Sequence, residues 1–226
     1  MSVAVIIPAF NEERGIAGVI ESIINAELPD EIIVVSDGST DKTVEIAKSF
    51  NSIKVIDKQT NQGKASAMKA GVNSTNADII VFVDADLVGL KPKYVDALIK
   101  PISENRVDIT MGLFSEGRFS TDWAQKMFPF LTGQRGMRRQ TWEDANIDHD
   151  IGYGVEMMLT KYIAAKNLKV QNVLLKGCTQ HLKEEKVKGK AMNGFSRRMK
   201  MAFEVVKLMF TPIPSKYKGK KKKVTG

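Results

Sequence analysis

The sequence has few of the features that mark secreted or membrane-spanning proteins. Its 226 residues include one cysteine, Cys178, so no disulfide can form within the chain, as is typical of proteins in a reducing cytoplasm. No apolar run approaches the ~20 residues that a membrane-spanning helix needs. The amino terminus enters an apolar segment without a basic region and cleavage site, so we expect no secretory signal. Together these absences favour a cytoplasmic globular protein.

Excess positive charge is scarce outside the carboxyl terminus. The formal net charge is +8, and without the six lysines of the last eleven residues it falls to +2. These six are Lys216, Lys218, Lys220, Lys221, Lys222 and Lys223. The body of the protein is therefore not a polybasic surface, and we expect no nucleic-acid partner.

Strand and helix patterns alternate over the first ~85 residues. Short runs rich in β-branched residues predict strands at 3–8, 32–35, 53–56 and 79–83. Helical spacing follows Asn11, Asp41 and Lys64. This alternation predicts an α/β fold with a mostly parallel sheet and helices on both faces. Ligands bind such sheets at the carboxyl ends of the strands.

Two carboxylates follow the predicted strand at 79–83. Asp84 and Asp86 are two residues apart, so they point the same way if the extended chain persists through Ala85. Two neighbouring carboxylates repel each other unless a cation lies between them. Oxygen ligands suit Mg²⁺ or Mn²⁺ bridged to a diphosphate. The alternative is a strand that ends in surface acids, because Asp-x-Asp is a short and common pattern.

The second half of the chain is less regular. Patterns there predict helices at 94–99 and 155–165 and strands at 108–113 and 168–175. The segment 128–139 mixes apolar and cationic residues, and we assign it no element.

A basic amphipathic helix is predicted near the carboxyl terminus, at 193–210. With the lysines beyond it, this helix is typical of an element that binds an anionic membrane surface. A helix packed on its own domain, followed by a disordered tail, remains equally open. We divide the chain into a globular domain at 1–182, a helical extension at 183–214 and a polybasic tail at 215–226.

Four motifs, in their order along the chain, resemble family 2 glycosyltransferases of the GT-A fold. The resemblance covers about residues 3–182 and implies transfer of a sugar from a nucleoside diphosphate sugar, with a divalent metal on the diphosphate. Residues 152–156 and the later His181 look like parts of glucosyl-3-phosphoglycerate synthases and, more loosely, of polyprenyl-phosphate sugar transferases. The motifs are Pro8-Ala9-Phe10-Asn11-Glu12-Glu13, Asp37-Gly38-Ser39-Thr40-Asp41, Asn61-x-Gly63-Lys64-x-x-Ala67 and Asp84-x-Asp86.

The sequence also departs from the family pattern. Ser36 stands where the family often has a second acid before Gly38. The Gln-x-x-Arg-Trp motif of processive synthases is absent, so we do not expect polymer synthesis.

The resemblance implies roles for the donor and metal site. The metal ligands would be Asp86 and His181, although a single histidine is more often a structural group. Lys64 begins a predicted helix, where a cation is unfavourable unless an anion lies beside it, so we expect a phosphate contact. Glu12 has an alternative role as an acid that stabilises its helix dipole. The residues expected to bind the nucleotide sugar are Pro8, Asn11, Glu12, Asp37, Lys64, Asp84 and Ala85.

The acceptor side is less well defined by the sequence. Glu156 and Asp144 are candidate bases for an inverting reaction, whereas in a retaining reaction Glu156 could position the acceptor. Arg135, Arg138 and Arg139 suit a phosphorylated metabolite or a polyprenyl phosphate. A solvated surface cluster is the alternative for these arginines.

Two other classes of function remain open. A nucleotidyltransferase should carry a glycine-rich phosphate loop after the first strand, and here that position reads Ala9-Phe10-Asn11-Glu12. The other class is a non-catalytic membrane-surface protein with a degenerate nucleotide site. The intact acids and Lys64 argue against such decay.

Overall fold

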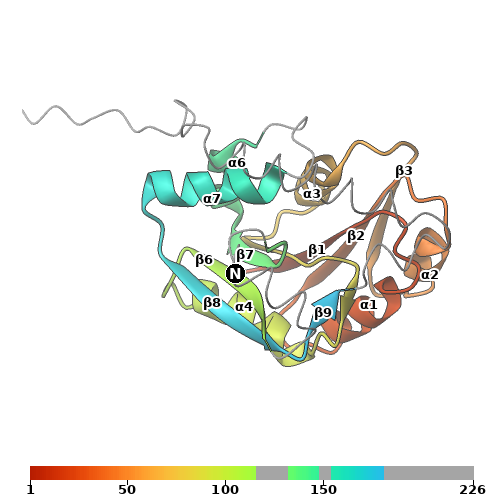
Figure 1. The fold of residues 1–226 in the computed structure, drawn as a ribbon, viewed down its shortest axis with the longest axis horizontal. Coiled ribbons are helices and arrows are strands. Elements are labelled where there is room, and N and C mark those ends of the chain that lie inside the picture. Colours follow the sequence, from red (N-terminus) through yellow and green to blue (C-terminus); the bar gives the residue numbers. More distant parts are fainter. Residues whose placement is uncertain (116–131, 148–153, 181–226) are drawn as a thin grey trace, which may run out of the picture.

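The fold was analysed in a computed structural model that describes residues 1–115, 132–147 and 154–180. Its elements alternate between strand and helix for most of that length (Figure 1). In chain order they are β1 (Val3–Ala9), α1 (Ile16–Ile24), β2 (Glu31–Asp37), α2 (Thr43–Lys48), β3 (Lys54–Lys58), α3 (Lys64–Asn73), β4 (Ile79–Phe82), β5 (Leu87–Val88), α4 (Pro92–Ser103), β6 (Ile109–Ser115), β7 (Arg135–Arg138), α6 (Arg139–Ala145), α7 (Val155–Lys166), β8 (Val170–Lys176) and β9 (Thr179–Gln180).

Seven strands form one mostly parallel sheet in the order β3-β2-β1-β4-β7-β6-β8. Strands β1 to β4 pair in parallel, as do β6 and β8, whereas β7 is antiparallel to both of its neighbours. A separate two-stranded sheet joins β5 to β9. The predicted α/β fold is therefore confirmed.

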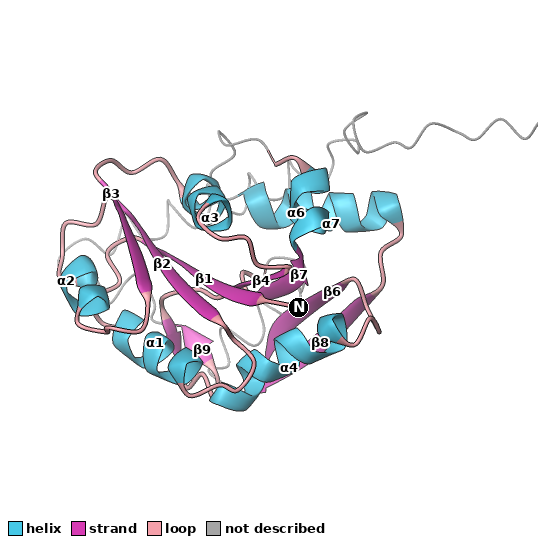
Figure 2. Cartoon of the chain, turned by 180° about the vertical axis from the view of Figure 1, so that it is seen from behind, coloured by secondary structure: helices cyan, strands magenta, loops and turns pink. Residues whose placement is uncertain are grey.

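Helices cover both faces of the large sheet. Helices α3, α6 and α7 lie on one face, and α1, α2 and α4 lie on the other (Figure 2). Strand β1 explains why both layers are needed, because Val5 and Ile7 enter one apolar cluster while Ala4 and Ile6 enter the other. Full burial of one such side chain contributes about 1.5–3 kcal/mol.

Strand β7 has no sequence pattern of its own. Its residues are Arg-Gly-Met-Arg, within the segment that we assigned no element. The strand forms because it fits between β4 and β6, where Gly136 leaves space for its neighbours. A Cβ on Gly136 would lie 2.6 Å from Thr110 Oγ1 and 2.8 Å from the carbonyl oxygen of Leu98. Tertiary packing therefore overrides local propensity here.

The turn after β4 differs from our expectation. The strand ends at Phe82, and Ala85 and Asp86 lie in a turn. The alternation argument for Asp84 and Asp86 was therefore wrong, since it needed extended chain through Ala85. The turn packs against the start of α1, where a Cβ on Gly15 would lie 2.6 Å from the carbonyl oxygen of Ala85.

The predicted carboxyl-terminal elements cannot be compared with this fold. The helix at 193–210 and the tail at 215–226 lie outside the described residues, so the three-part division of the chain stays a prediction. Among the residues that are described, no helix combines the length and apolarity needed to cross a bilayer.

Replacing Gly136 by alanine should destabilise the fold. The added methyl group would press on Leu98 backbone that cannot move freely, so we expect the free energy of unfolding to fall by about 1–3 kcal/mol. Chemical denaturation measures this change.

Gly18→Ala is the matched control. Gly18 lies within α1, and a Cβ there would meet nothing within 4 Å. This variant should gain roughly 0.5–1 kcal/mol through helix propensity. Equal stabilities for the two variants would contradict the packing assigned to β7.

Candidate functional site

The loops at one edge of the sheet form the candidate site. Strands β1, β2 and β4 are parallel neighbours, so the segments that follow them emerge at the same edge. Those segments begin with Phe10, Gly38 and Val83. The sheet therefore brings together the three motifs that the sequence predicted at strand ends.

Lys64 lies between two carboxylates at this edge. Its Nζ is 2.6 Å from Asp84 Oδ1 and 2.6 Å from Glu156 Oε1. Three elements supply the group, because Lys64 begins α3, Asp84 follows β4 and Glu156 is in the first turn of α7. A site residue predicted for the donor and one predicted for catalysis thus share a single cation.

Burial and charge act in opposite directions on Lys64. Burial by itself would lower the pKa of the ammonium group, but Asp84 and Glu156 together raise that pKa above its ordinary value. Lys64 is therefore charged at neutral pH. Our argument from the helix dipole predicted an anion at this position, and the protein's own carboxylates supply it, so a phosphate contact stays a prediction.

The other carboxylate oxygen of Asp84 is also held. Asp84 Oδ2 accepts hydrogen bonds from Gln134 Nε2 at 2.8 Å and from Gln180 Nε2 at 3.3 Å. Beside it, a Cβ on Gly133 would lie 2.5 Å from Asp84 Oδ1. Sequence analysis missed these three residues because none of them carries a charge. Gly133 and Gln134 also lie in the segment that we assigned no element.

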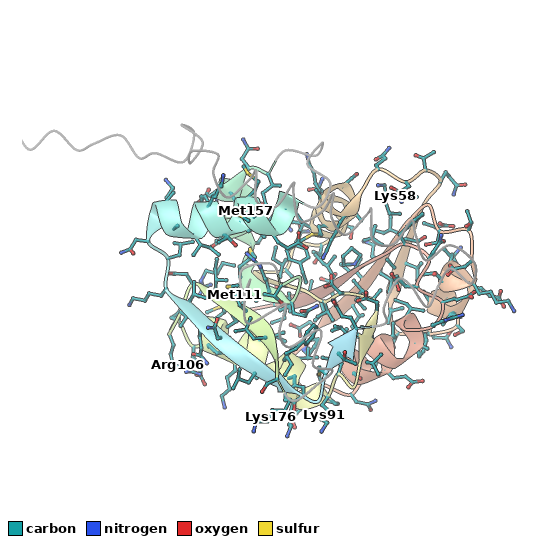
Figure 3. The ribbon with its side chains drawn as sticks, in the orientation of Figure 1. Lys58, Lys91, Arg106, Met111, Met157 and Lys176 are labelled. Atoms are coloured by element: carbon teal, nitrogen blue, oxygen red, sulfur yellow. The ribbon has the colours of Figure 1, made fainter. Side chains whose placement is uncertain are left out.

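Asp37 supports the loop that precedes Lys64. Its carboxylate is buried and accepts hydrogen bonds from the backbone N–H of Gln62 at 3.1 Å and of Gly63 at 2.6 Å. It also forms an ion pair with Lys58. Lys58 is the last residue of β3 and is labelled in Figure 3. Lys58 was missed from the sequence, where nothing distinguishes it from a surface lysine. The expected contact of Asp37 with the nucleotide sugar stays a prediction.

The loop after β1 is fastened to the loop after β2. The backbone N–H of Asn11 donates to Ser39 Oγ at 3.1 Å, and Asn11 Oδ1 accepts from the N–H of Thr40 at 2.8 Å. Asn11 adopts a left-handed conformation with φ +56°, which asparagine tolerates better than most residues. The two loops therefore form one framework.

Three further positions complete this framework. Glu12 is buried, and its N–H donates to Thr43 Oγ1 at 2.8 Å. Pro8 is half-buried near the end of β1. Phe10 is 45% exposed. Sequence analysis did not single out Phe10.

A metal site would have to be built around the turn after β4. Asp86 lies in that turn, one residue before β5, and Ala85 is buried. Strand β9 pairs with β5 so that Gln180 opposes Leu87. His181, the other predicted ligand, lies outside the described residues. Within the ranges described, no group of three or more histidine, cysteine or acidic side chains has metal-binding geometry.

The oxygen atoms available as metal ligands nonetheless suit a hard cation. Asp84 and Asp86 supply carboxylate oxygens, and Mg²⁺ is commonly bound by one or two carboxylates together with substrate phosphates and waters. A site of that kind needs no complete cage of protein ligands. The turn is therefore compatible with the predicted Mg²⁺ or Mn²⁺.

The structure does not bring the three predicted arginines together. Arg135 opposes Phe82, at the end of β4 that leads to Asp84, whereas Arg138 opposes Ile79 at the other end. Arg139 follows Arg138 and pairs with Glu143 at 2.8 Å. Since β7 crosses the sheet from one edge to the other, a single acceptor-binding cluster of all three is wrong.

Arg135 remains near the Lys64 group. Its side chain is buried, and its Nε and Nη2 donate to the carbonyl oxygen of Thr132 at 3.0 Å and to Thr160 Oγ1 at 3.1 Å. Burial lowers the pKa of Arg135 to about 10, and the charge of Glu156 acts against this shift. The guanidinium therefore stays protonated at neutral pH.

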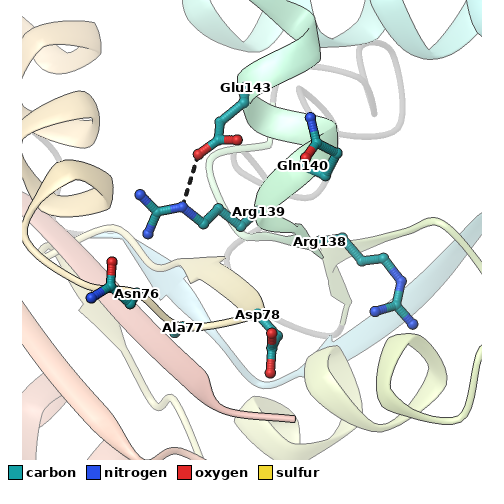
Figure 4. A pocket seen from close by; sticks show the side chains of 7 residues that line it. All are labelled: Asn76, Ala77, Asp78, Arg138, Arg139, Gln140 and Glu143. Carbon is teal, nitrogen blue, oxygen red and sulfur yellow. Dashed lines mark hydrogen bonds and ion pairs between the residues drawn. The ribbon is translucent and has the colours of Figure 1, made fainter.

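Arg138 and Arg139 line a cavity of about 260 Å³ at the opposite edge (Figure 4). Their side chains point away from each other, and Arg138 donates a hydrogen bond to Asn105, which lies just after α4. Asp144 is exposed on α6 and accepts a hydrogen bond from Gln140 Nε2 at 2.9 Å. Of the two predicted bases, Glu156 is the one that contacts Lys64.

The comparison with known families decides the class of protein. Residues 4–162 match the family described as Glycosyl transferase family 2. The chain belongs to this family. The predicted GT-A fold and the glycosyltransferase class are thereby confirmed, and the family favours neither a nucleotidyltransferase nor a non-catalytic protein.

Solved structures agree with this assignment. Glucosyl-3-phosphoglycerate synthase from Mycobacterium tuberculosis, in complex with phosphoglyceric acid, is 26% identical with a TM-score of 0.66, covering 80% of this chain and 72% of that one. Its complex with Mn²⁺, UDP-glucose and phosphoglyceric acid gives a TM-score of 0.69 at 24% identity, covering 93% and 81%. A complex with Mg²⁺ and UDP gives 0.70 at 24% identity, covering 93% and 80%.

Curated relatives share only part of their length with the chain. The 4,4'-diaponeurosporenoate glycosyltransferase of Staphylococcus aureus (strain bovine RF122 / ET3-1) is 39% identical over 102 residues, which are 43% of this chain and 27% of the relative. The protein of strain USA300 is 38% identical over 102 residues, which again are 43% of this chain and 27% of the relative. The chain thus spans about a quarter of the length of these relatives.

Replacing Asp37 by alanine should loosen the loop before Lys64. The backbone amides of Gln62 and Gly63 would lose their acceptor, so we expect hydrogen exchange at Gly63 to accelerate by about tenfold or more. Exchange measured by NMR or mass spectrometry reports this directly.

Asp57→Ala controls for the loss of one acidic charge nearby. Asp57 is exposed on β3, and its removal should leave exchange at Gly63 unchanged. If both variants exchange at the wild-type rate, Asp37 does not hold this loop.

Proposed function

We propose that the protein transfers a sugar from a nucleoside diphosphate sugar to a small anionic acceptor, with Mg²⁺ or Mn²⁺ on the diphosphate. The observation that carries the proposal is Lys64, held at 2.6 Å from both Asp84 and Glu156 at the carboxyl edge of the sheet. This group joins the element expected to bind the donor to the residue expected to act on the acceptor.

The donor would bind along the joined loops after β1 and β2. Pro8, Asn11 and Glu12 would contact one side of the donor, and Asp37 would support the loop on the other side. Exposed Phe10 offers an aromatic face on which a nucleobase could stack. We name UDP-glucose as the first donor to test, because the synthase that shares this fold was crystallised with it.

The phosphates and metal would lie beside the turn after β4. Asp86 would ligate the metal, with Asp84 and Ala85 on the ribose side. His181 is the next residue after Gln180, which pairs with Leu87, and is our second proposed ligand. When bound, the metal would stabilise the negative charge of the leaving diphosphate. Lys64 would place a fixed positive charge beside the same phosphates.

Glu156 would act on the acceptor. In an inverting reaction its carboxylate would remove the proton of an acceptor hydroxyl, and in a retaining reaction it would orient that hydroxyl. The ion pair with Lys64 holds the carboxylate of Glu156 in place for either role. Asp144 is the weaker candidate because it lies on exposed α6 and bonds to Gln140.

The acceptor would be an acid, either a phosphorylated metabolite or a polyprenyl phosphate. Arg135 would supply positive charge near the site, whereas Arg138 and Arg139 lie too far along β7 to help. The synthase was crystallised with phosphoglyceric acid, and the curated relatives are named for 4,4'-diaponeurosporenoate. Both names describe anions, which supports an anionic acceptor.

Two variants test the donor and acceptor roles together. Calorimetric titration of the wild-type protein with UDP-glucose and Mn²⁺ should show metal-dependent binding. Asp86→Ala should lose that metal dependence, because a metal ligand is removed. Glu156→Gln should still bind the donor, whereas its transfer rate should fall by about 10²–10⁴-fold.

Thermal stability of both variants provides the control for folding. Unchanged metal-dependent binding in Asp86→Ala would remove this residue from the metal site. Wild-type turnover in Glu156→Gln would exclude the role proposed for its carboxylate. If no nucleotide sugar binds the wild-type protein with either metal, the proposed activity is wrong.

We also propose that the carboxyl-terminal residues 183–226 bring the protein to an anionic membrane surface, where a polyprenyl phosphate would be available. Six lysines at about 1 kcal/mol each can contribute substantially to such binding. Deleting residues 215–226 should weaken association with anionic liposomes but not with neutral ones. Equal binding of the two proteins to anionic liposomes would rule out the tail as an anchor.

A further inference from the structure

The carboxylate of Asp84 is held through both of its oxygens. Lys64 Nζ lies 2.6 Å from Oδ1, and Gln134 Nε2 donates to Oδ2 at 2.8 Å. These partners come from opposite sides of Asp84 in the chain, α3 and the residue before β7. The rotamer of Asp84 is thus set by residues that are distant from it in the sequence.

The amide of Gln134 is fixed in turn. Its side chain belongs to a residue that is 1% exposed, and its Oε1 lies 2.8 Å from Thr132 Oγ1, whose single hydroxyl proton is shared with the carbonyl oxygen of Gly112 at 2.6 Å. The backbone oxygen of Gln134 also accepts from the N–H of Gly112 at 2.8 Å, which ties it to β6. If the amide turned over, its oxygen would face the Asp84 carboxylate, and two acceptors would repel each other.

Gly133 provides the space that this arrangement needs. A Cβ at this position would lie 2.5 Å from Asp84 Oδ1 and 2.7 Å from Cγ. Real Cβ atoms do not approach other atoms so closely, so any side chain at 133 would displace the carboxylate. The dipeptide Gly133-Gln134 therefore both admits Asp84 and orients it.

We infer that Gln134 is a positioning residue for Asp84 and, through it, for Lys64. Gln134 would not touch the donor, and its effect would pass through the carboxylate that it holds. The inference rests on the donor-side role proposed for Asp84. Without the Gln134 amide, Oδ2 would keep the longer contact from Gln180 at 3.3 Å.

Gln134→Met is the variant that tests this inference. Methionine has a similar length and no charge, so it fills the buried space but cannot donate to Asp84. Gln140→Met is the matched control, because Gln140 is exposed on α6 and bonds to Asp144 instead. Thermal unfolding should confirm that both variants are folded before binding is measured.

Two measurements are made on the folded proteins. The first is the rate at which a mild acylating reagent modifies Lys64, followed by mass spectrometry of its peptide, without any ligand. Gln134→Met should raise this rate several-fold over wild type, because the carboxylate that shields Lys64 is held less firmly. The second is the dissociation constant of UDP-glucose in the presence of Mn²⁺, which should rise on the order of 10- to 100-fold, as for a lost hydrogen bond to a charged group.

Gly133→Ala provides an independent variant. It should change both measurements in the same direction as Gln134→Met, because its methyl group pushes the same carboxylate away. Gln140→Met should match wild type in both.

The outcomes separate this inference from the proposed function. Wild-type acylation rates in both Gln134→Met and Gly133→Ala would overturn the inference, whatever the donor. If the wild-type protein binds no UDP-glucose, the proposed donor fails, and the acylation rates alone decide the role of Gln134. Faster acylation with an unchanged donor dissociation constant would overturn the link to donor binding.

Discussion

The ion pairs of Lys64 are the interaction on which the candidate site depends. A lysine at the start of a helix is opposed by the helix dipole, and burial further disfavours its charge. Asp84 and Glu156 offset both costs, each at 2.6 Å. Removing either acid would leave a partly buried cation under-compensated, which is far more costly than losing a surface pair. Three segments from different parts of the chain are thereby held in one arrangement.

The sheet order makes this arrangement possible. Strand β4 lies at the centre, with parallel β1 on one side and antiparallel β7 on the other. On the parallel side, the loops that follow the strands lie at the site. Asp37 holds the loop before Lys64 through its contacts with Lys58 and the backbone N–H of Gly63. The antiparallel side delivers the start of a strand, which is how Gln134 and Arg135 reach the same edge as Asp84. Parallel and antiparallel neighbours of β4 are therefore both needed to surround the carboxylate of Asp84.

Sequence patterns predicted much of the first half and less of the second. Strands β1, β2 and β4 contain runs of β-branched residues, and β3 contains a shorter one. Motifs that follow these strands identified Asp37, Lys64 and Asp84 as site residues whose roles remain predictions. Strand β7 has only Met137 as a large apolar residue, so no periodicity marks it. In the sequence, Arg135, Arg138 and Arg139 look like one cluster because they are close in number. In the structure, Arg135 lies at one end of β7 and Arg138 at the other end.

The sequence by itself determined the family, the alternation of strand and helix, and which acids follow the central strand. The alternation and the position of the acids are local, since they depend on spacing over a few residues, whereas the family shows in several such motifs in their order along the chain. Only the tertiary structure decided that β4 ends at Phe82, that Lys64 contacts Glu156, and that Gln134 orients Asp84. The partners in these contacts are 92 and 50 residues apart. No local pattern encodes such contacts, because they arise only when helices and strands pack against one another.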